Sequence, residues 1–328
     1  MAVKIAFGIM SAHQQAGTVD QLIGTLGAHP VIIHHDFGQT PDFAIRRPNV
    51  QFVPAPKKTG WGNWGFSQAI LHTLEHCIRH VDFDYFQLLS PTCLPIRPIE
   101  AFERRLGSPQ DDANIDLIDL AADEPALMDY GYRTYAPEGS MRYRLLRRMR
   151  LWYLGINPSR THQRSLSVVK PALWASVQPR LRSRIGLELT RLARDGWIGR
   201  HPFGRDFKAF VGSTWFGANR AVCEHIVFRA AEPGLRDYFS RAHLPDELMF
   251  PTLIGNSGFR LGGSNHLVNR FNEQGHPVWL QQRDLDRLLT ATAFFARKFP
   301  DDPAAAVRLE LIGRVSQRFG AGATVQGR

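Results

Sequence analysis

Strand-like and helix-like runs alternate through about the first third of the chain, and this alternation restricts the fold more than any other feature. The strand-like runs cover residues 3–10, 30–34, 50–53, 85–89 and 115–120, and the helix-like runs cover residues 18–26, 67–81 and 99–106. Thr18 and Ser67 stand where a side-chain hydroxyl would cap the first two helices. The alternation predicts right-handed crossovers, and therefore an α/β fold with a mainly parallel sheet flanked by helices.

Polar residues follow two of the predicted strands. Asp36 follows the second strand-like run and Ser90 follows the fourth. Ligands bind beyond the carboxyl ends of strands in such sheets, although Asp36 could equally be a turn residue and Ser90 a loop hydroxyl. Asp82 and Asp84 precede the fourth strand, so this Asp-x-Asp pair is predicted at the opposite edge, as a solvated turn rather than a metal site.

A turn opened by proline, residues 243–250 (HLPDELMF), places two carboxylates directly before an apolar run. Ordinary helices often begin this way, because Asp246 and Glu247 would complement the positive end of the helix dipole. Pro251 has no amide hydrogen to donate to the carbonyl of Glu247. The helix is therefore predicted to end or kink at Pro251.

Two further segments of the second half carry candidate residues. Residues 206–216 are predicted as a strand that contains Trp215, which would ordinarily be a core residue, and a helix should follow over residues 218–228. Residues 284–295 form a helix-like run that ends just before Arg297 and Lys298. Basic residues there would ordinarily be stabilised by the negative end of the helix dipole.

Six short blocks of the sequence follow one another in a fixed order. They are residues 31–36 (VIIHHD), 61–67 (WGNWGFS), 86–96 (FQLLSPTCLPI), 210–216 (FVGSTWF), 243–250 (HLPDELMF) and 294–299 (FFARKF). In this order they resemble the core-2/I-branching β-1,6-N-acetylglucosaminyltransferase family, which includes the protein xylosyltransferases. The resemblance covers most of the chain outside residues 105–205.

This resemblance implies a GT-A-type, Rossmann-like fold and an inverting, metal-independent glycosyltransferase that needs no cofactor. UDP-N-acetylglucosamine is the expected donor, with UDP-xylose as the alternative, and a glycan is the expected acceptor. The implied roles are Glu247 as general base, Asp36 and Ser90 at the nucleotide, Trp215 as a ring on which the acceptor sugar stacks, and Arg297 and Lys298 at the diphosphate.

One block departs from the family pattern. Members usually show Ser-Gly-x-Asp-x-Pro after the fourth strand, whereas this chain has Ser-Pro-Thr-Cys-Leu-Pro from Ser90, with Cys93 at the place of the Asp. The departure puts the usual donor contact, and with it the usual donor sugar, in question. A free cysteine is ordinarily a small buried hydrophobic residue, and no neighbouring base suggests a nucleophile.

The positive charge of the chain is concentrated in one segment. Residues 141–186 hold eleven Lys plus Arg and no acidic residue, whereas the rest of the chain has 29 basic and 30 acidic residues, so this segment accounts for the net charge of +10. We divide a single glycosyltransferase domain into a nucleotide-sugar-binding half (1–125), a variable, partly helical basic insertion (126–205) and an acceptor and catalytic half (206–328).

The basic segment has three interpretations. Within residues 141–153 arginines alternate with apolar residues, which predicts either a surface on the anionic cytoplasmic membrane, where a lipid-linked glycan acceptor would be found, or a helix packed on the domain. In a different functional class, a basic binding protein would use residues 141–186 to hold nucleic acid or anionic polysaccharide. The segment contains no recognisable nucleic-acid module, so we expect no nucleic-acid partner.

The compartment is predicted from the cysteines and the N-terminus. Cys77, Cys93 and Cys223 are odd in number and lack Cys-x-x-Cys spacing, which fits a reduced cytoplasm. A charged n-region followed by an apolar h-region is missing at the start of the sequence, so neither a signal peptide nor a membrane anchor is expected. Animal members of the family are Golgi-anchored and rich in disulfides, so this chain resembles a bacterial relative, cytoplasmic or peripheral on the inner membrane face.

Overall fold

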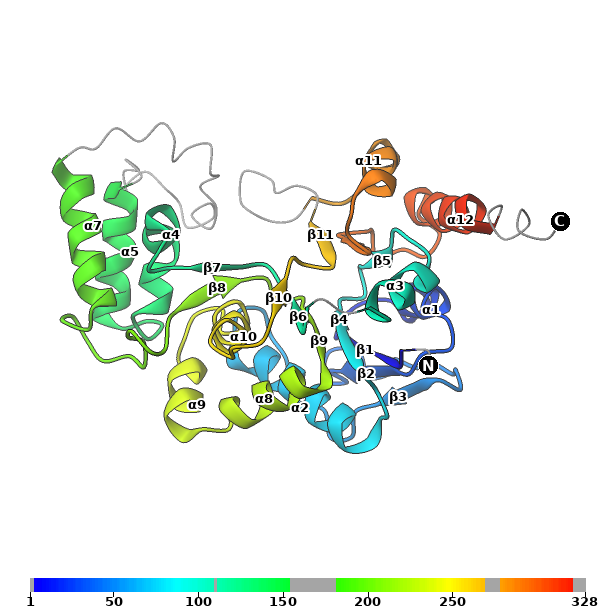
Figure 1. The fold of residues 1–328 in the computed structure, drawn as a ribbon, viewed down its shortest axis with the longest axis horizontal. Helices are drawn as coiled ribbons and strands as arrows, with labels where there is room; N and C mark the ends of the chain where they lie inside the picture. The colour runs from blue at the N-terminus through cyan, green and yellow to red at the C-terminus, as the bar shows by residue number, and fades with distance from the viewer. Residues whose placement is uncertain (1–2, 109–110, 154–180, 269–277, 321–328) are drawn as a thin grey trace.

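A seven-stranded sheet forms the centre of the computed structural model, which describes residues 3–108, 111–153, 181–268 and 278–320 (Figure 1). Its strands, in spatial order, are β10 (Leu261–Gly262), β6 (Ala113–Asn114), β9 (Gly217–Asn219), β4 (Tyr85–Leu89), β1 (Ile5–Ser11), β2 (Val31–His35) and β3 (Val50–Phe52). Within it β4, β1, β2 and β3 are parallel, and β9 runs antiparallel to both its neighbours. The chain is therefore a mixed α/β protein with a mainly parallel sheet, as predicted, and it is compatible with a Rossmann-like fold.

Helices cover both faces of this sheet. Successive side chains of a strand point to opposite faces, so each strand contributes to two cores. In β1, Ile5, Phe7 and Ile9 face one core, whereas Ala6 and Met10 face the other. The first core includes α1 (Ala16–Gly24), α3 (Ile99–Leu106), α11 (Leu285–Thr290) and α12 (Ala306–Gly320). The second includes α2 (Trp64–His80), α8 (Arg220–Ala230), α9 (Pro233–Ser240) and α10 (Asp246–Gly255).

Two smaller sheets extend the central one. The first has the order β11 (His266–Val268), β12 (Phe295–Arg297) and β5 (Leu94–Pro95), and the second pairs β7 (Leu117–Asp119) with β8 (Phe210–Gly212). Beyond β7 and β8, on the left of Figure 1, lie α4 (Glu124–Thr134), α5 (Met141–Tyr153) and α7 (Leu181–Arg194). We call these three helices the helical lobe. Within the described residues, no helix combines the length and the apolar character needed to cross a bilayer.

Both predicted helix caps are wrong. The α1 helix begins two residues before Thr18, which is buried inside it, and Gln15 occupies the N-cap position. The α2 helix begins three residues before Ser67, at an N-cap where the side chain of Asn63 accepts a hydrogen bond from the amide of Gly65 at 3.0 Å. Asn63 takes the role because its carbonyl oxygen reaches an amide of the first turn that has no helical partner.

The strand predicted over residues 206–216 is shorter than expected. Only Phe210–Gly212 form a strand, β8, whereas β9 begins at Gly217, just past the predicted end, and Trp215 lies in the connection between them. The chain turns there because the amide of Ser213 donates to the carbonyl of Asp116 at 2.9 Å and the amide of Trp215 donates to the Ser213 hydroxyl at 3.1 Å. These bonds direct the chain from the two-stranded sheet into the central one.

Two helix predictions in the C-terminal part also need correction. The helix expected over residues 284–295 ends at Thr290, and Arg297 is the last residue of β12, because Phe295 and Ala296 pair with both β5 and β11. Neither Arg297 nor Lys298 therefore lies in the last turn of a helix. The α10 helix also continues through Pro251 and does not end there, since it is buried on nearly all sides and packs on β8 and α8.

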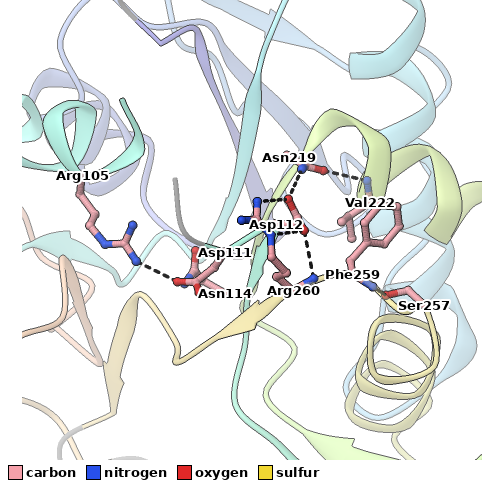
Figure 2. Close-up of polar contacts among 9 residues, drawn as sticks. All are labelled: Arg105, Asp111, Asp112, Asn114, Asn219, Val222, Ser257, Phe259 and Arg260. Atoms are coloured by element: carbon pink, nitrogen blue, oxygen red, sulfur yellow. Dashed lines mark hydrogen bonds and ion pairs between the residues drawn. The ribbon is translucent and has the colours of Figure 1, made fainter. Parts of the chain in front are cut away.

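The amino ends of the central strands are joined by polar contacts (Figure 2). Asp112 accepts hydrogen bonds from the amide, Nε and Nη2 of Arg260 at 3.0 to 3.1 Å, and from the Asn219 side chain at 3.2 Å. At the same edge, Asp82 pairs with the side chain of Lys4 and Asp84 accepts from its amide. The prediction that Asp82 and Asp84 lie at the edge of the sheet opposite the carboxyl ends of β1 and β4 is confirmed.

Candidate functional site

A cleft of about 640 Å³ opens where β1 and β4 end. The chain leaves β1 towards β2 and β3 and returns to β4 on the other side of β1, so this is the point at which the strand order reverses. Open α/β sheets bind their ligands at such a point. The candidate residues that line the cleft are Ser90, Trp215, Glu247, Arg297 and Lys298.

Asp36 is the one candidate residue outside the cleft lining. It is buried just beyond β2, where its carboxylate accepts hydrogen bonds from the amide and hydroxyl of Thr59 at 2.6 and 3.0 Å and from the Gln39 side chain at 2.9 Å. Burial opposes ionisation, but these bonds hold the pKa of Asp36 below its usual value. Thr59 and Gln39 line the cleft, so Asp36 holds two residues of the cleft lining in place.

The loop before α2 forms one wall of the cleft. The amide of Lys57 donates to Nε2 of His34 at 2.9 Å, and Thr59 is held by Asp36. His34 can accept this bond because its burial lowers its pKa to about 4 and keeps the ring neutral. Two acceptors at the end of β2 thus fix the segment that leads to Trp61, an exposed residue of the cleft lining.

Arg297 and Lys298 form a cationic wall of the cleft. The guanidinium of Arg297 lies 4.6 Å from the centre of the Trp215 ring, and Nζ of Lys298 lies 4.2 Å from the centre of the Trp279 ring. Burial lowers the pKa of both side chains, and Arg297 contributes to the shift of Lys298. Among the described residues neither pairs with a carboxylate, and the buried Nε of Arg297 has no hydrogen-bond partner. Buried charge without a counter-charge is costly, so this wall is suited to an anionic ligand.

The residues behind Arg297 do not neutralise it. Cys93 is fully buried, burial raises the pKa of its thiol, and its sulfur accepts a hydrogen bond from the amide of Ser90 at 3.4 Å. Burial and Arg297 lower the pKa of His266 to about 3, so the ring is neutral. An Asp at position 93 would have supplied a negative charge near Arg297, whereas a buried thiol supplies none.

Asp246 and Glu247 form a second, acidic part of the lining. Asp246 is buried, and its Oδ2 accepts a hydrogen bond from the Thr214 hydroxyl at 2.6 Å. Glu247 is more open, with 39% of its side chain exposed, and its Oε2 accepts from Nη2 of Arg133 at 2.8 Å. Two neighbouring carboxylates therefore differ in environment, and Glu247 is the one accessible to a substrate.

Burial and the charge of Glu247 raise the pKa of Asp246 to about 6, although Thr214 and Arg133 oppose the shift. Between about pH 4 and pH 6 the folded protein keeps a proton that the unfolded chain has lost, so its stability should fall as pH rises through this window. Asp246→Asn removes this penalty. We expect the variant to gain ~1 to 3 kcal/mol relative to the wild type at pH 7.5 and little at pH 4, as measured by thermal melts at both pH values. A gain independent of pH would contradict this expectation.

Sequence analysis did not find Arg133, which contacts Glu247 of the cleft lining, or the cleft residues at the end of β1. Arg133 belongs to the part of the chain that the family resemblance does not cover, and no spacing or motif indicates that it would meet Glu247. Residues 11–14, which line the cleft after β1, could have been found by the rule that identified Asp36, because they directly follow a predicted strand.

Within the described residues, no group of three or more His, Cys, Asp or Glu side chains is arranged to bind a metal ion. Comparisons with protein-family models and with curated proteins give no match for this chain. The function is therefore argued from the cleft itself.

Proposed function

We propose that the chain is an inverting glycosyltransferase of the GT-A type, related to the core-2/I-branching family, that uses a UDP-sugar donor. The observation that supports this best is the composition of the cleft: two cations without carboxylate partners among the described residues, and an accessible carboxylate, line the same cavity at the reversal of strand order. A nucleotide sugar needs the cations for its diphosphate, and its acceptor needs the carboxylate.

In the proposed reaction, the diphosphate lies against Arg297 and Lys298. Glu247 removes the proton from an acceptor hydroxyl while the hydroxyl oxygen bonds to the anomeric carbon from the face opposite the diphosphate. The bond from the anomeric carbon to the phosphate oxygen breaks, and UDP leaves with its added negative charge stabilised by the two cations. An α-linked donor thereby gives a β-linked product, with N-acetylglucosamine as the first choice of sugar and xylose as the second.

The other candidate residues have supporting roles in this proposal. Ser90 lies at the end of β4, where its hydroxyl is 2.8 Å from that of Thr92 and both residues line the cleft near the expected nucleotide. Trp215 is 92% buried and packs in the core, so one edge of its ring at most contacts the acceptor sugar. Asp36 holds the loop that includes Thr59.

The proposal is tested by incubating the purified protein with a panel of UDP-sugars and nucleoside diphosphates. We expect UDP and one UDP-sugar to raise the melting temperature, and that UDP-sugar to be hydrolysed slowly without an acceptor. If heparin or DNA raised the melting temperature and every nucleotide sugar failed to do so, the proposed function would be wrong and a basic binding protein would be favoured.

The proposed transfer requires no divalent metal, because Arg297 and Lys298 supply positive charge where a metal-dependent enzyme of this sheet type would use a cation. Asp82 and Asp84 lie at the opposite edge of the sheet, so they are not available to hold a metal ion in the cleft. We expect the rate of transfer to be unchanged in excess EDTA, as measured by UDP release. Loss of activity in EDTA with recovery in Mn²⁺ would refute this.

The helical lobe is the proposed contact with an anionic membrane that carries the acceptor. Part of α5 is packed in the lobe, where Leu146, Met149 and Leu151 are buried, while Met141 and Leu145 are exposed. We expect the protein to float with vesicles that contain anionic lipid and not with neutral vesicles, and the binding to weaken as salt rises. Arg144→Glu on the exposed face of α5 should reduce flotation, whereas Arg104→Glu on α3 should not. Equal flotation with both vesicle types would contradict a charge-dependent contact.

A further inference from the structure

An arginine of the helical lobe reaches the acidic part of the cleft. Arg133 lies in the last turn of α4, and its side chain is 7% exposed. Its Nη2 donates to Oε2 of Glu247 at 2.8 Å, and its guanidinium lies 4.7 Å from the centre of the Tyr130 ring. The second terminal nitrogen, Nη1, is buried without a hydrogen-bond partner among the described residues.

The helix that carries Arg133 is itself held firmly. Arg150 of α5 forms a buried ion pair with Asp129, and Arg191 of α7 pairs with Glu124 at 2.9 Å. Both acidic partners belong to the first two turns of α4. The packing of the whole helical lobe therefore determines the position of Arg133.

We propose that Arg133 is a positioning residue for Glu247, and that the helical lobe is for this reason part of the active site. The proposal rests on the proposed function, in which Glu247 is the general base. A carboxylate has two oxygens, and Arg133 binds Oε2, which leaves Oε1 to face an acceptor hydroxyl. Because the guanidinium is itself fixed by the packing of the lobe, it also holds the carboxylate of Glu247 in one orientation.

An arginine at position 133 contributes little to the stability of the fold. Its burial costs desolvation energy, its partner Glu247 is 39% exposed, and one of its nitrogens is unsatisfied. A long apolar side chain such as Met would fill the same space without these costs. Arg133→Met should therefore fold with little loss of melting temperature, so that any loss of transfer reports on Glu247.

The test compares transfer in Arg133→Met, Arg133→Lys and the wild type. We expect Arg133→Met to lower kcat roughly 10- to 100-fold with the dissociation constant for UDP unchanged, because one charged hydrogen bond to the base is lost. The loss should appear in kcat and not in KM for the donor, because the diphosphate is proposed to lie against Arg297 and Lys298, which are not changed. Arg133→Lys keeps a cationic hydrogen-bond donor beside Glu247 and should recover part of the lost kcat.

A double variant separates this inference from the proposed function. If Arg133 acts through Glu247, adding Arg133→Met to Glu247→Gln should cause no further loss of transfer. Arg194→Met removes an ion pair of the lobe that does not involve α4, the pair with Asp195 at 2.7 Å, and serves as the control that should behave like the wild type. If Glu247→Gln is inactive while Arg133→Met has a normal kcat, the positioning role is wrong and the proposed base remains. If Glu247→Gln is normal, the proposed base itself is wrong.

Discussion

Glu247→Gln should reduce transfer roughly 10²- to 10⁴-fold and leave the dissociation constant for UDP nearly unchanged. The amide keeps the size of the side chain and can still accept a hydrogen bond from Arg133, but it cannot take a proton from the acceptor. The cations proposed to bind the diphosphate, Arg297 of β12 and Lys298 after it, are not altered. Single-turnover transfer and isothermal titration with UDP would measure the two quantities separately.

A matched substitution elsewhere shows whether loss of a carboxylate alone has this effect. Glu224 lies on α8, where it pairs with Arg220 on the surface at 3.0 Å, so Glu224→Gln should transfer normally. Asp246 is the rival base, since its Oδ1 is buried in the lining without a hydrogen-bond partner among the described residues. If Glu247→Gln showed near-normal transfer and Asp246→Asn were folded but inactive, Asp246 would be the base in place of Glu247.

Arg297→Met and Lys298→Met should each weaken UDP binding roughly 10- to 100-fold, because each removes a charge-assisted hydrogen bond to the diphosphate. The loss should extend to kcat, since negative charge on the leaving diphosphate grows in the transition state. UDP titration and steady-state kinetics measure the two effects. The melting temperature of unliganded Arg297→Met should not fall, because the wild-type side chain lacks a carboxylate partner among the described residues.

Lys208→Met is the control for these two variants. Lys208 pairs with Asp119 at 2.9 Å and is half exposed, and it does not line the cleft. UDP affinity should therefore be unchanged when Lys208 is replaced. If Lys208→Met weakened binding as much as Lys298→Met, the effect would come from net charge and not from a diphosphate site.

Strands β1, β2 and β4 could be predicted from the sequence because they are short, largely apolar runs that are buried on both faces. All their residues are buried, and these runs differ clearly from the spaced apolar pattern of α2. The place of the cleft could be predicted from the same strands, because Ser90 directly follows β4. Glu247 and Lys298 were indicated by resemblance, and the structure places them in the same cleft as Ser90.

Local signals failed where tertiary contacts decide the structure. The helix predicted over residues 284–295 ends at Thr290, because Phe295 and Ala296 pair with β5 and β11 as part of β12. Pro251 was expected to end or kink its helix, and burial keeps the helix continuous through it. Arg133 could not be predicted, because it meets Glu247 across 114 residues of sequence and a lone arginine on a helix carries no sign of its partner.

The antiparallel pairing of β9 with β4 also has a consequence for synthesis of the chain on the ribosome. β4 can pair with β1 early in synthesis, but its other edge stays unpaired until β9 has been made. The side chain of Gln87 in β4 donates a hydrogen bond to the carbonyl of Phe216, next to β9, and 129 residues of sequence separate the two. At about 5 to 20 residues per second, that edge stays open for roughly 6 to 26 s in each nascent chain. An unpaired edge of apolar sequence can pair with a second nascent chain. Slowing translation between codons 90 and 216 should therefore increase aggregation during synthesis, without any change to the finished protein.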